Sequence, residues 1–204
     1  GIHFDYIRYQ DIFYGYNSTG IDIFENKHGF NPKDLNRGVI STRFGYKEDE
    51  VDSLTNLWDQ YKLDSITNFL ISVKNLIIND GYTLEMSVAA KPDILEAKYR
   101  WYQDWIYWIN ENIVDYAVIM NYEKNINKFN LYNKLIKNRL TFEKMKKINI
   151  GISMFNQDAI SVSDKILLSR LNGFENYSLF SYDVGKDTLG WYKPVVKVLN
   201  FNLK

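Results

Sequence analysis

Apolar and polar residues follow strand and helix periodicities in turn along this chain. The opening stretch, GIHFDYIRYQ, alternates the two kinds of residue as a half-buried strand does. Helical spacing of apolar residues then extends over about 53–79, where Asp80–Gly81 ends it. Four further strands are predicted at the mostly apolar stretches YTLEMSVAA, VDYAVIMNY, INIGISMF and YSLFSYD. The pattern therefore predicts five strands, each followed by a helix.

The segments between these strands predict the remaining helices. We expect helices over about 101–113, 131–146 and 163–173, and a last helix over about 188–199 that Pro194 disturbs. The long polar stretch 10–51 contains a short helix over about 21–27, ended by Gly29. Connections of this length inside a compact domain are usually functional.

Mostly apolar strands alternating with helices are typical of a parallel sheet buried on both faces. Two α/β architectures fit, a doubly wound open sheet and part of a (β/α)8 barrel of the TIM type. No glycine-rich phosphate loop follows a strand, because SVAAKPD and MNYEKN match neither common pattern. The barrel is therefore favoured. In either architecture the ligand site lies at the carboxyl ends of the strands, where polar residues gather, namely Asp5, Arg8, Tyr9, Asn121, Tyr122, Glu123, Asn156, Gln157, Tyr182 and Asp183.

Composition narrows the class of protein. With 204 residues, 46% of them hydrophobic, residues 1–204 suffice for one domain. The net charge is zero, and no run of Lys and Arg is long enough to suggest a nucleic-acid partner. No apolar run approaches the ~20 residues of a membrane span. Without cysteine there is no disulfide, catalytic thiol or Cys-ligated zinc, and with only two histidines a His3–Asp5 metal site is disfavoured, so we expect no metal and no cofactor.

Aromatic residues make up 16% of the chain, with five Trp and sixteen Tyr. Tyr and Trp rings stack on the apolar faces of sugars while their polar tips bond to hydroxyl groups. Ordinary core packing is the alternative, and composition alone favours it.

The opening stretch GIHFDYIRYQ resembles the strand motif of the glycosyl-hydrolase-like 10 family of (β/α)8 glycosidases. YGYNSTGIDIFENKHG resembles the tyrosine–asparagine loop and short helix of that family, and WYQDWIYWINENIVDYAVIMNY its Gln-Asp-Trp helix and following strand. INIGIS and LFSYD are similar to its last two strands, so the resemblance covers nearly the whole chain in order.

The chain departs from the family pattern at two positions. Gln10 stands where the family usually has proline, and Lys62 stands where arginine is common, which puts a bidentate contact there in doubt. If the opening strand corresponds to the fourth strand of the barrel, about five of the eight βα units are present. The resemblance thus implies that this chain is the C-terminal part of a larger barrel.

Asp5 is the strongest catalytic candidate, because glycoside hydrolysis needs paired carboxylates and Asp5 ends a barrel strand. An ion pair with Arg8 or His3 is the structural alternative. For the second carboxylate we predict Asp104 of the family-like Gln-Asp-Trp motif, which on base rates is a helix N-cap. Its rivals are Glu123 and Asp93.

Other polar residues are predicted to contact substrate. Arginine, asparagine and histidine can bond to hydroxyl, acetamido or carboxylate groups, and tyrosine offers both a ring and a hydroxyl. The predicted substrate-binding residues are His3, Arg8, Tyr9, Asn121, Tyr122 and Tyr182. Packing between strands and helices is the alternative for the tyrosines.

The resemblance implies a glycosidase that hydrolyses a polysaccharide, with bacterial cell-wall glycan as a candidate substrate. A non-catalytic glycan-binding module and an inactive barrel fragment are the alternatives. An extracytoplasmic location is expected for the whole protein. Open sheet edges are also expected to make the 204 residues self-associate.

Overall fold

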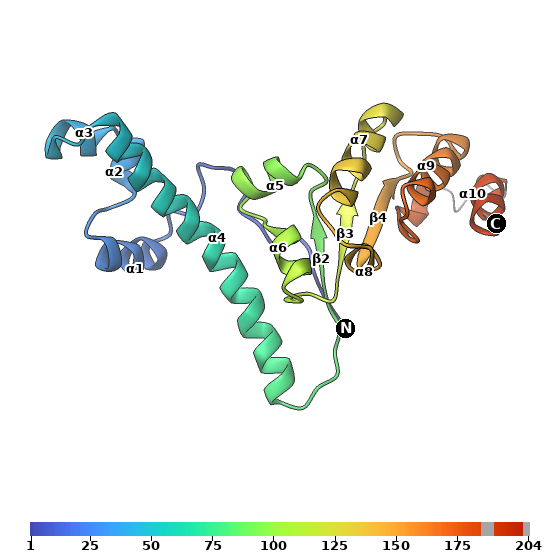
Figure 1. Cartoon of the computed structure of the whole chain (residues 1–204), viewed down its shortest axis with the longest axis horizontal. Coiled ribbons are helices and arrows are strands. Elements are labelled where there is room, and N and C mark those ends of the chain that lie inside the picture. The colour runs from blue at the N-terminus through green and yellow to red at the C-terminus, as the bar shows by residue number, and fades with distance from the viewer. Residues whose placement is uncertain (185–189, 202–204) are drawn as a thin grey trace.

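The computed structural model describes residues 1–184 and 190–201 and contains one parallel five-stranded sheet (Figure 1). Its strands are β1 (Ile2–Phe4), β2 (Met86–Ala90), β3 (Tyr116–Met120), β4 (Ile148–Ser153) and β5 (Asn176–Phe180). They lie in the order in which they occur along the chain, and each pair is parallel. All five predicted strands are therefore confirmed.

The helices that follow β2, β3 and β4 connect neighbouring strands. They are α5 (Ile94–Tyr99) and α6 (Trp105–Asn110), then α7 (Ile126–Lys137) and α8 (Phe142–Met145), then α9 (Ala159–Leu171). After β5 come the short 3-10 helix η1 (Tyr182–Val184) and α10 (Lys193–Leu199). Right-handed crossovers that all step in one direction place their helices on one face, whereas a doubly wound sheet must reverse its strand order. The predicted barrel-type α/β fold is confirmed, as a partial (β/α)8 barrel.

Some predicted helix boundaries were wrong. The helix expected over 101–113 is only α6, because Tyr102 has a φ of 51° and Asp104 then caps a new start. The helix expected over 131–146 is two helices, with Thr141 capping the second. Helix α5 was not predicted. The expected start of the last helix at Thr188 lies outside the described residues, and α10 begins at Lys193.

A helical arm extends away from the sheet (Figure 1). It consists of α1 (Ser18–His28), α2 (Lys33–Asn36), α3 (Val39–Phe44) and the first half of α4 (Glu48–Asn79). The predicted stop of α1 at Gly29 is confirmed, since this residue has a φ of 80°. Phe24 packs edge-on against Trp58 of α4, with ring centroids 4.9 Å apart.

Lys62 of α4 fixes the long loop after β1 to this helix. Its buried ammonium lies 3.1 Å from the Asp59 carboxylate and donates to the Ile12 carbonyl oxygen and the Tyr102 hydroxyl. Burial lowers the pKa of Lys62, and the charge of Asp59 opposes this effect. A single ammonium therefore makes several contacts at the position where a bidentate arginine was in doubt.

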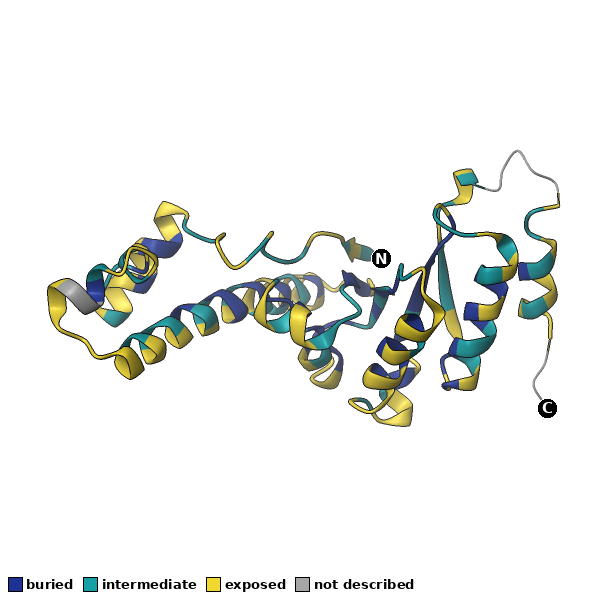
Figure 2. Cartoon of the chain, turned by 90° about the horizontal axis from the view of Figure 1, so that it is seen from above, coloured by how far each residue is buried: buried dark blue, intermediate teal, exposed yellow. Residues whose placement is uncertain are grey.

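The core lies between the sheet and its helices, where the buried residues gather (Figure 2). Burial alternates along β3. Ala117 and Ile119 are fully buried toward the helices, whereas Tyr116, Val118 and Met120 are only half-buried. The opposite face of the sheet, which would line the interior of a barrel, is therefore partly open. Among the described residues, β1 and β5 are the edge strands, and each pairs with a neighbour on one side only.

No helix in the described part of the chain is long and apolar enough to cross a membrane.

Candidate active site

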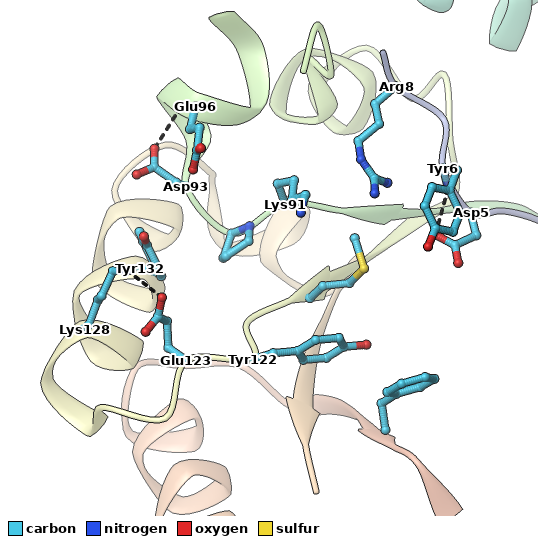
Figure 3. Close-up of a pocket in the computed structure, with 13 residues that line it drawn as sticks. Asp5, Tyr6, Arg8, Lys91, Asp93, Glu96, Tyr122, Glu123, Lys128 and Tyr132 are labelled. Atoms are coloured by element: carbon cyan, nitrogen blue, oxygen red, sulfur yellow. Dashed lines mark hydrogen bonds and ion pairs between the residues drawn. The ribbon is translucent and has the colours of Figure 1, made fainter. Parts of the chain in front are cut away.

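A polar pocket of about 520 Å³ lies at the carboxyl ends of β1, β2 and β3 (Figure 3). Asp5 follows β1, Lys91 follows β2, and Tyr122 and Glu123 follow β3. Because parallel strands end at one edge of the sheet, residues far apart in the sequence meet there. The pocket is lined by Asp5, Tyr6, Arg8, Lys91, Pro92, Asp93, Glu96, Met120, Tyr122, Glu123, Lys128, Tyr132 and Phe180.

Asp5 presents an exposed carboxylate to this pocket. One of its oxygens accepts a hydrogen bond from the backbone N–H of Tyr6 at 2.7 Å, and Tyr6 adopts a φ of 55°. Burial, together with the negative charge of Asp5, raises the pKa of Tyr122 across the pocket. Among the described residues Asp5 forms no ion pair, so the pairing with Arg8 or His3 considered above is absent there.

The backbone at Tyr122 and Glu123 is fixed by residues that follow β4. Asn156 donates from its side chain to the Tyr122 carbonyl oxygen at 3.2 Å, and buried Lys165 donates to the carbonyl oxygen of Glu123. The ring of Tyr122 stacks on Phe180, with centroids 5.7 Å apart and an interplanar angle of 13°. This arrangement orients a tyrosine hydroxyl and a carboxylate at the pocket.

Each of the other three carboxylates of the pocket has a partner. Glu123 forms an ion pair with Lys128 at 2.6 Å. Glu96 pairs with Arg100 at 2.9 Å. Asp93 caps α5 by accepting from the backbone N–H groups of Leu95 and Glu96.

Arg8 and Lys91 are the cations of the pocket that have no carboxylate partner among the described residues (Figure 3). The Arg8 guanidinium carbon lies 4.6 Å from the centroid of the Tyr6 ring. The Nε and Nη1 atoms of Arg8 are buried and have no hydrogen-bond partner among residues 1–184 and 190–201. Burial lowers the pKa of Lys91, and the positive charge of Arg8 lowers it further. Its Nζ lies 4.9 Å from the centroid of the Trp101 ring.

The Gln-Asp-Trp motif holds the end of β2 in place. Buried Gln103 accepts from the Lys91 backbone N–H at 2.9 Å and donates to the carbonyl oxygens of Ile7 and Ala89. The indole N–H of Trp105 donates to the Lys91 carbonyl oxygen at 3.0 Å. Both backbone polar groups of Lys91 are thus fixed by this motif.

Asp104 does not line the pocket that contains Asp5. It caps α6 by accepting from the Tyr107 backbone N–H and forms an ion pair with Lys98 at 2.7 Å. Its side chain borders a different hollow, together with Gln60 and Asp64 of α4. The structure therefore does not bring the two predicted catalytic carboxylates together, because the turn before α6 carries Gln103 inward and Asp104 toward α4. A catalytic role for Asp104 stays a prediction.

The predicted substrate-binding residues divide in the same way. Arg8 and Tyr122 line the pocket with Asp5. His3 instead bonds to the Ser87 hydroxyl through Nδ1 at 2.8 Å, and Tyr9 packs edge-on against Tyr102. These two lie outside the pocket lining.

Asn121 and Tyr182 also lie outside the pocket lining. Asn121 is fully buried and donates to the Phe129 carbonyl oxygen and the Asn133 side chain. Tyr182 is exposed and stacks on Tyr192. Asn121 is thus part of the layer between β3 and its helix.

Sequence reasoning missed Lys91, Glu96 and Lys128 as pocket residues. The position of Lys91 directly after a predicted strand was a usable signal. Glu96 and Lys128 lie within helices whose starts are capped by Asp93 and Asn125. Their direction toward the pocket depends on where those helices begin, which the sequence prediction did not place correctly. Among the described residues no group of three or more His, Asp or Glu side chains is arranged to hold a metal ion.

Comparison with known proteins gives a family and a fold. The family model described as glycosyl hydrolase-like 10 matches residues 1–176. No curated protein sequence matches the chain. Among solved structures, the chain is similar to the glycoside hydrolase domain of PgaB (BpsB) from Bordetella bronchiseptica, with a TM-score of 0.68 and 10% identity. The match covers 100% of this chain but 57% of that one.

Proposed function

Because the chain belongs to the glycosyl hydrolase-like 10 family, we propose that it is a glycoside hydrolase that cleaves a polysaccharide by paired-carboxylate catalysis. The observation that carries the proposal is the exposed carboxylate of Asp5 at the end of β1, which forms no ion pair with any described residue and lies in a pocket that also contains Glu123. Catalytic residues of (β/α)8 enzymes lie at this end of the strands. We further propose that residues 1–204 act as one domain, without a cofactor, and outside the cytoplasm.

In the mechanism we propose, Asp5 acts as the nucleophile or the base at the sugar carbon. A second carboxyl group donates its proton to the leaving oxygen, and we propose Glu123 for this role. Glu123 is half-buried, shares the pocket with Asp5, and has its backbone fixed by Lys165. Its pairing with Lys128 is solvent-exposed and therefore weak, so an entering sugar can displace it.

The stacked rings of Tyr122 and Phe180 provide an apolar surface for a sugar at the same pocket. The Tyr122 hydroxyl keeps its proton, because burial and the nearby Asp5 raise its pKa. We therefore propose that it donates a hydrogen bond to Asp5 or to a substrate oxygen in the bound complex.

The Asp5→Asn variant tests the proposal. We expect hydrolysis of a susceptible glycan to fall by about 10²–10⁴-fold. The unfolding midpoint should stay unchanged, because this carboxylate is exposed and forms no ion pair in the part of the chain that the structure describes. Reducing-end release is measured over a panel of polysaccharides, with the unfolding midpoint followed in parallel. Wild-type rates in Asp5→Asn would disprove this role.

Glu123→Gln and Asp104→Asn form a matched pair that identifies the second carboxylate. We expect Glu123→Gln to lose about 10²–10⁴-fold in hydrolysis and Asp104→Asn to retain hydrolysis, since asparagine also caps a helix. Rates are compared per folded molecule. The reverse result would restore Asp104 as the acid.

A non-catalytic glycan-binding module is the second candidate. Three carboxylates of the pocket are already engaged by an ion pair or by backbone N–H groups, which favours a binding role for the pocket over proton donation to a substrate. In that case the wild-type chain binds an oligosaccharide but hydrolyses none of the panel, and Asp5→Asn leaves its affinity within about twofold. An inactive barrel fragment would neither bind nor hydrolyse.

A further inference from the structure

The pocket contains two cations whose positions are fixed but whose charges are not neutralised. Arg8 and Lys91 have no carboxylate partner among residues 1–184 and 190–201, although four carboxylates line the same pocket. Lys128, the third cation, is already paired with Glu123. Three of the four carboxylates of the pocket thus have partners, whereas the half-buried Arg8 and Lys91 have no anion beside them within the described part of the chain.

Such an arrangement is costly unless an anion joins it. Nε and Nη1 of Arg8 are buried, and no described residue accepts a hydrogen bond from them. Buried guanidinium donors without acceptors destabilise the folded protein. A bound carboxylate would offset this cost, because charge-assisted hydrogen bonds between arginine and carboxylate are strong and often bidentate. The nearby positive charge of Lys91 adds repulsion that the same anion would relieve.

Aromatic rings and backbone contacts hold the two cations in place. The guanidinium carbon of Arg8 lies 4.6 Å from the centroid of the Tyr6 ring and 6.0 Å from the centroid of the Trp101 ring. The Lys91 Nζ lies 4.9 Å from the centroid of the same Trp101 ring. The backbone of Lys91 is fixed on both sides by Gln103 and Trp105. The side chain of Lys91 therefore extends from a backbone position that is fixed at the end of β2, unlike a lysine side chain on a mobile loop.

We propose that Arg8 and Lys91 form a subsite for a carboxylate carried by the sugar in this pocket, so that the preferred substrate is an acidic polysaccharide. This rests on the proposed function, because it takes the ligand of the pocket to be a glycan. The carboxylate belongs either to a uronic acid, at C6 of the ring, or to a carboxyalkyl ether on a ring oxygen. Both place a planar anion where a guanidinium bonds to two oxygens at once.

Matched acidic and neutral probes test the subsite and distinguish the two sources. The first pair is a hyaluronan tetrasaccharide and its carboxyl-reduced counterpart. The second is methyl N-acetylmuramide and methyl N-acetylglucosaminide, which differ only in the carboxyalkyl ether. Affinity is measured by ligand-detected NMR titration of the chain. We expect the acidic member of one pair to bind about 10–100-fold more tightly than its neutral counterpart.

Three charge-removing variants locate the effect. Arg8→Gln and Lys91→Gln should each reduce the acid-to-neutral ratio toward one. Lys146→Gln removes the same charge from the opposite end of the sheet, where Lys146 pairs with Glu143, and should preserve the ratio. If Arg8→Gln does not fold, Lys91→Gln alone decides the result. A ratio of one in the wild type, or a ratio that Arg8→Gln and Lys91→Gln leave unchanged, would overturn the subsite.

Hydrolysis of the same panel separates this inference from the proposed function. Cleavage of neutral glycans without any preference for acidic probes would refute the subsite and leave the glycosidase intact. A preference for acidic probes that depends on Arg8, without hydrolysis of any glycan, would keep the subsite and refute the enzyme.

Discussion

The two ends of the sheet both have charged hollows, but their charges serve different purposes. At the amino ends, a hollow of about 320 Å³ is bordered by Asp115, Lys146 and Lys147. Asp115 there accepts from the Met86 backbone N–H at 2.6 Å. Nearby Lys144 donates to the carbonyl oxygens of Ile109 and Asn110. These charged groups join the backbone of one βα unit to that of the next.

At the carboxyl ends, no hydrogen bond within residues 1–184 and 190–201 joins the side chain of Asp5, Arg8 or Lys91 to the backbone of a neighbouring unit. The backbone there is fixed by the amides of Gln103 and Asn156 and by buried Lys165, which lies outside the pocket lining. Charged side chains therefore join neighbouring units at the amino ends, whereas three charged side chains of the pocket at the carboxyl ends, those of Asp5, Arg8 and Lys91, form no ion pair among the described residues. Asp and Lys side chains thus bond to the backbone at the amino ends of the strands, whereas Asp5 and Lys91 line the pocket at the carboxyl ends.

Gln103 lies beneath the pocket and forms hydrogen bonds with three backbone groups. Among substitutions at the two ends of the sheet, its replacement should therefore have the largest combined effect on stability and activity. Gln103→Leu leaves the Lys91 N–H and the Ile7 and Ala89 carbonyl groups without their partner in a buried place. We expect a loss of about 2–4 kcal/mol in the free energy of unfolding and a further loss of activity per folded molecule. Denaturant unfolding and hydrolysis rates measure the two effects. A stable variant with full activity would show that the hydrogen bonds of Gln103 are not needed to hold the end of β2 in place.

Asp115→Ala should have a smaller effect that is confined to stability. The Met86 N–H loses its side-chain acceptor at a partly buried position, and we expect about 1–2 kcal/mol of lost unfolding free energy. Hydrolysis per folded molecule should not change, because Asp115 is at the far end of the strand. Asp5→Asn serves as the matched variant with the opposite result. Lower activity in folded Asp115→Ala would remove the distinction between the two ends.

The smallest expected effect concerns the edges of the sheet. Strands β1 and β5 each leave one side unpaired among the described residues, and exposed edges tend to pair with other strands. We expect the 204-residue chain to elute in size-exclusion chromatography at a mass above 24.2 kDa that decreases on dilution. A stable monomer at all concentrations would contradict this prediction.

The sequence by itself determined the strands, their parallel arrangement and the end at which the site lies. Strand-length apolar runs such as YAVIM and INIGIS leave little choice of secondary structure, and the absence of phosphate loops favoured the barrel. Gly29 predicted the end of α1 through its conformational freedom. Asp5 could be singled out because it ends a strand whose motif is specific.

Only the tertiary structure decided which polar residues share the pocket. Asp104 and Gln103 are neighbours in one motif, yet a turn with Tyr102 at positive φ carries one toward α4 and the other under β2. Asn121 and Tyr122 are likewise adjacent just after β3, yet Asn121 is buried against α7 and Tyr122 lines the pocket. Sequence position fixes where a side chain begins, whereas the direction it takes depends on local backbone geometry and on the elements packed against it.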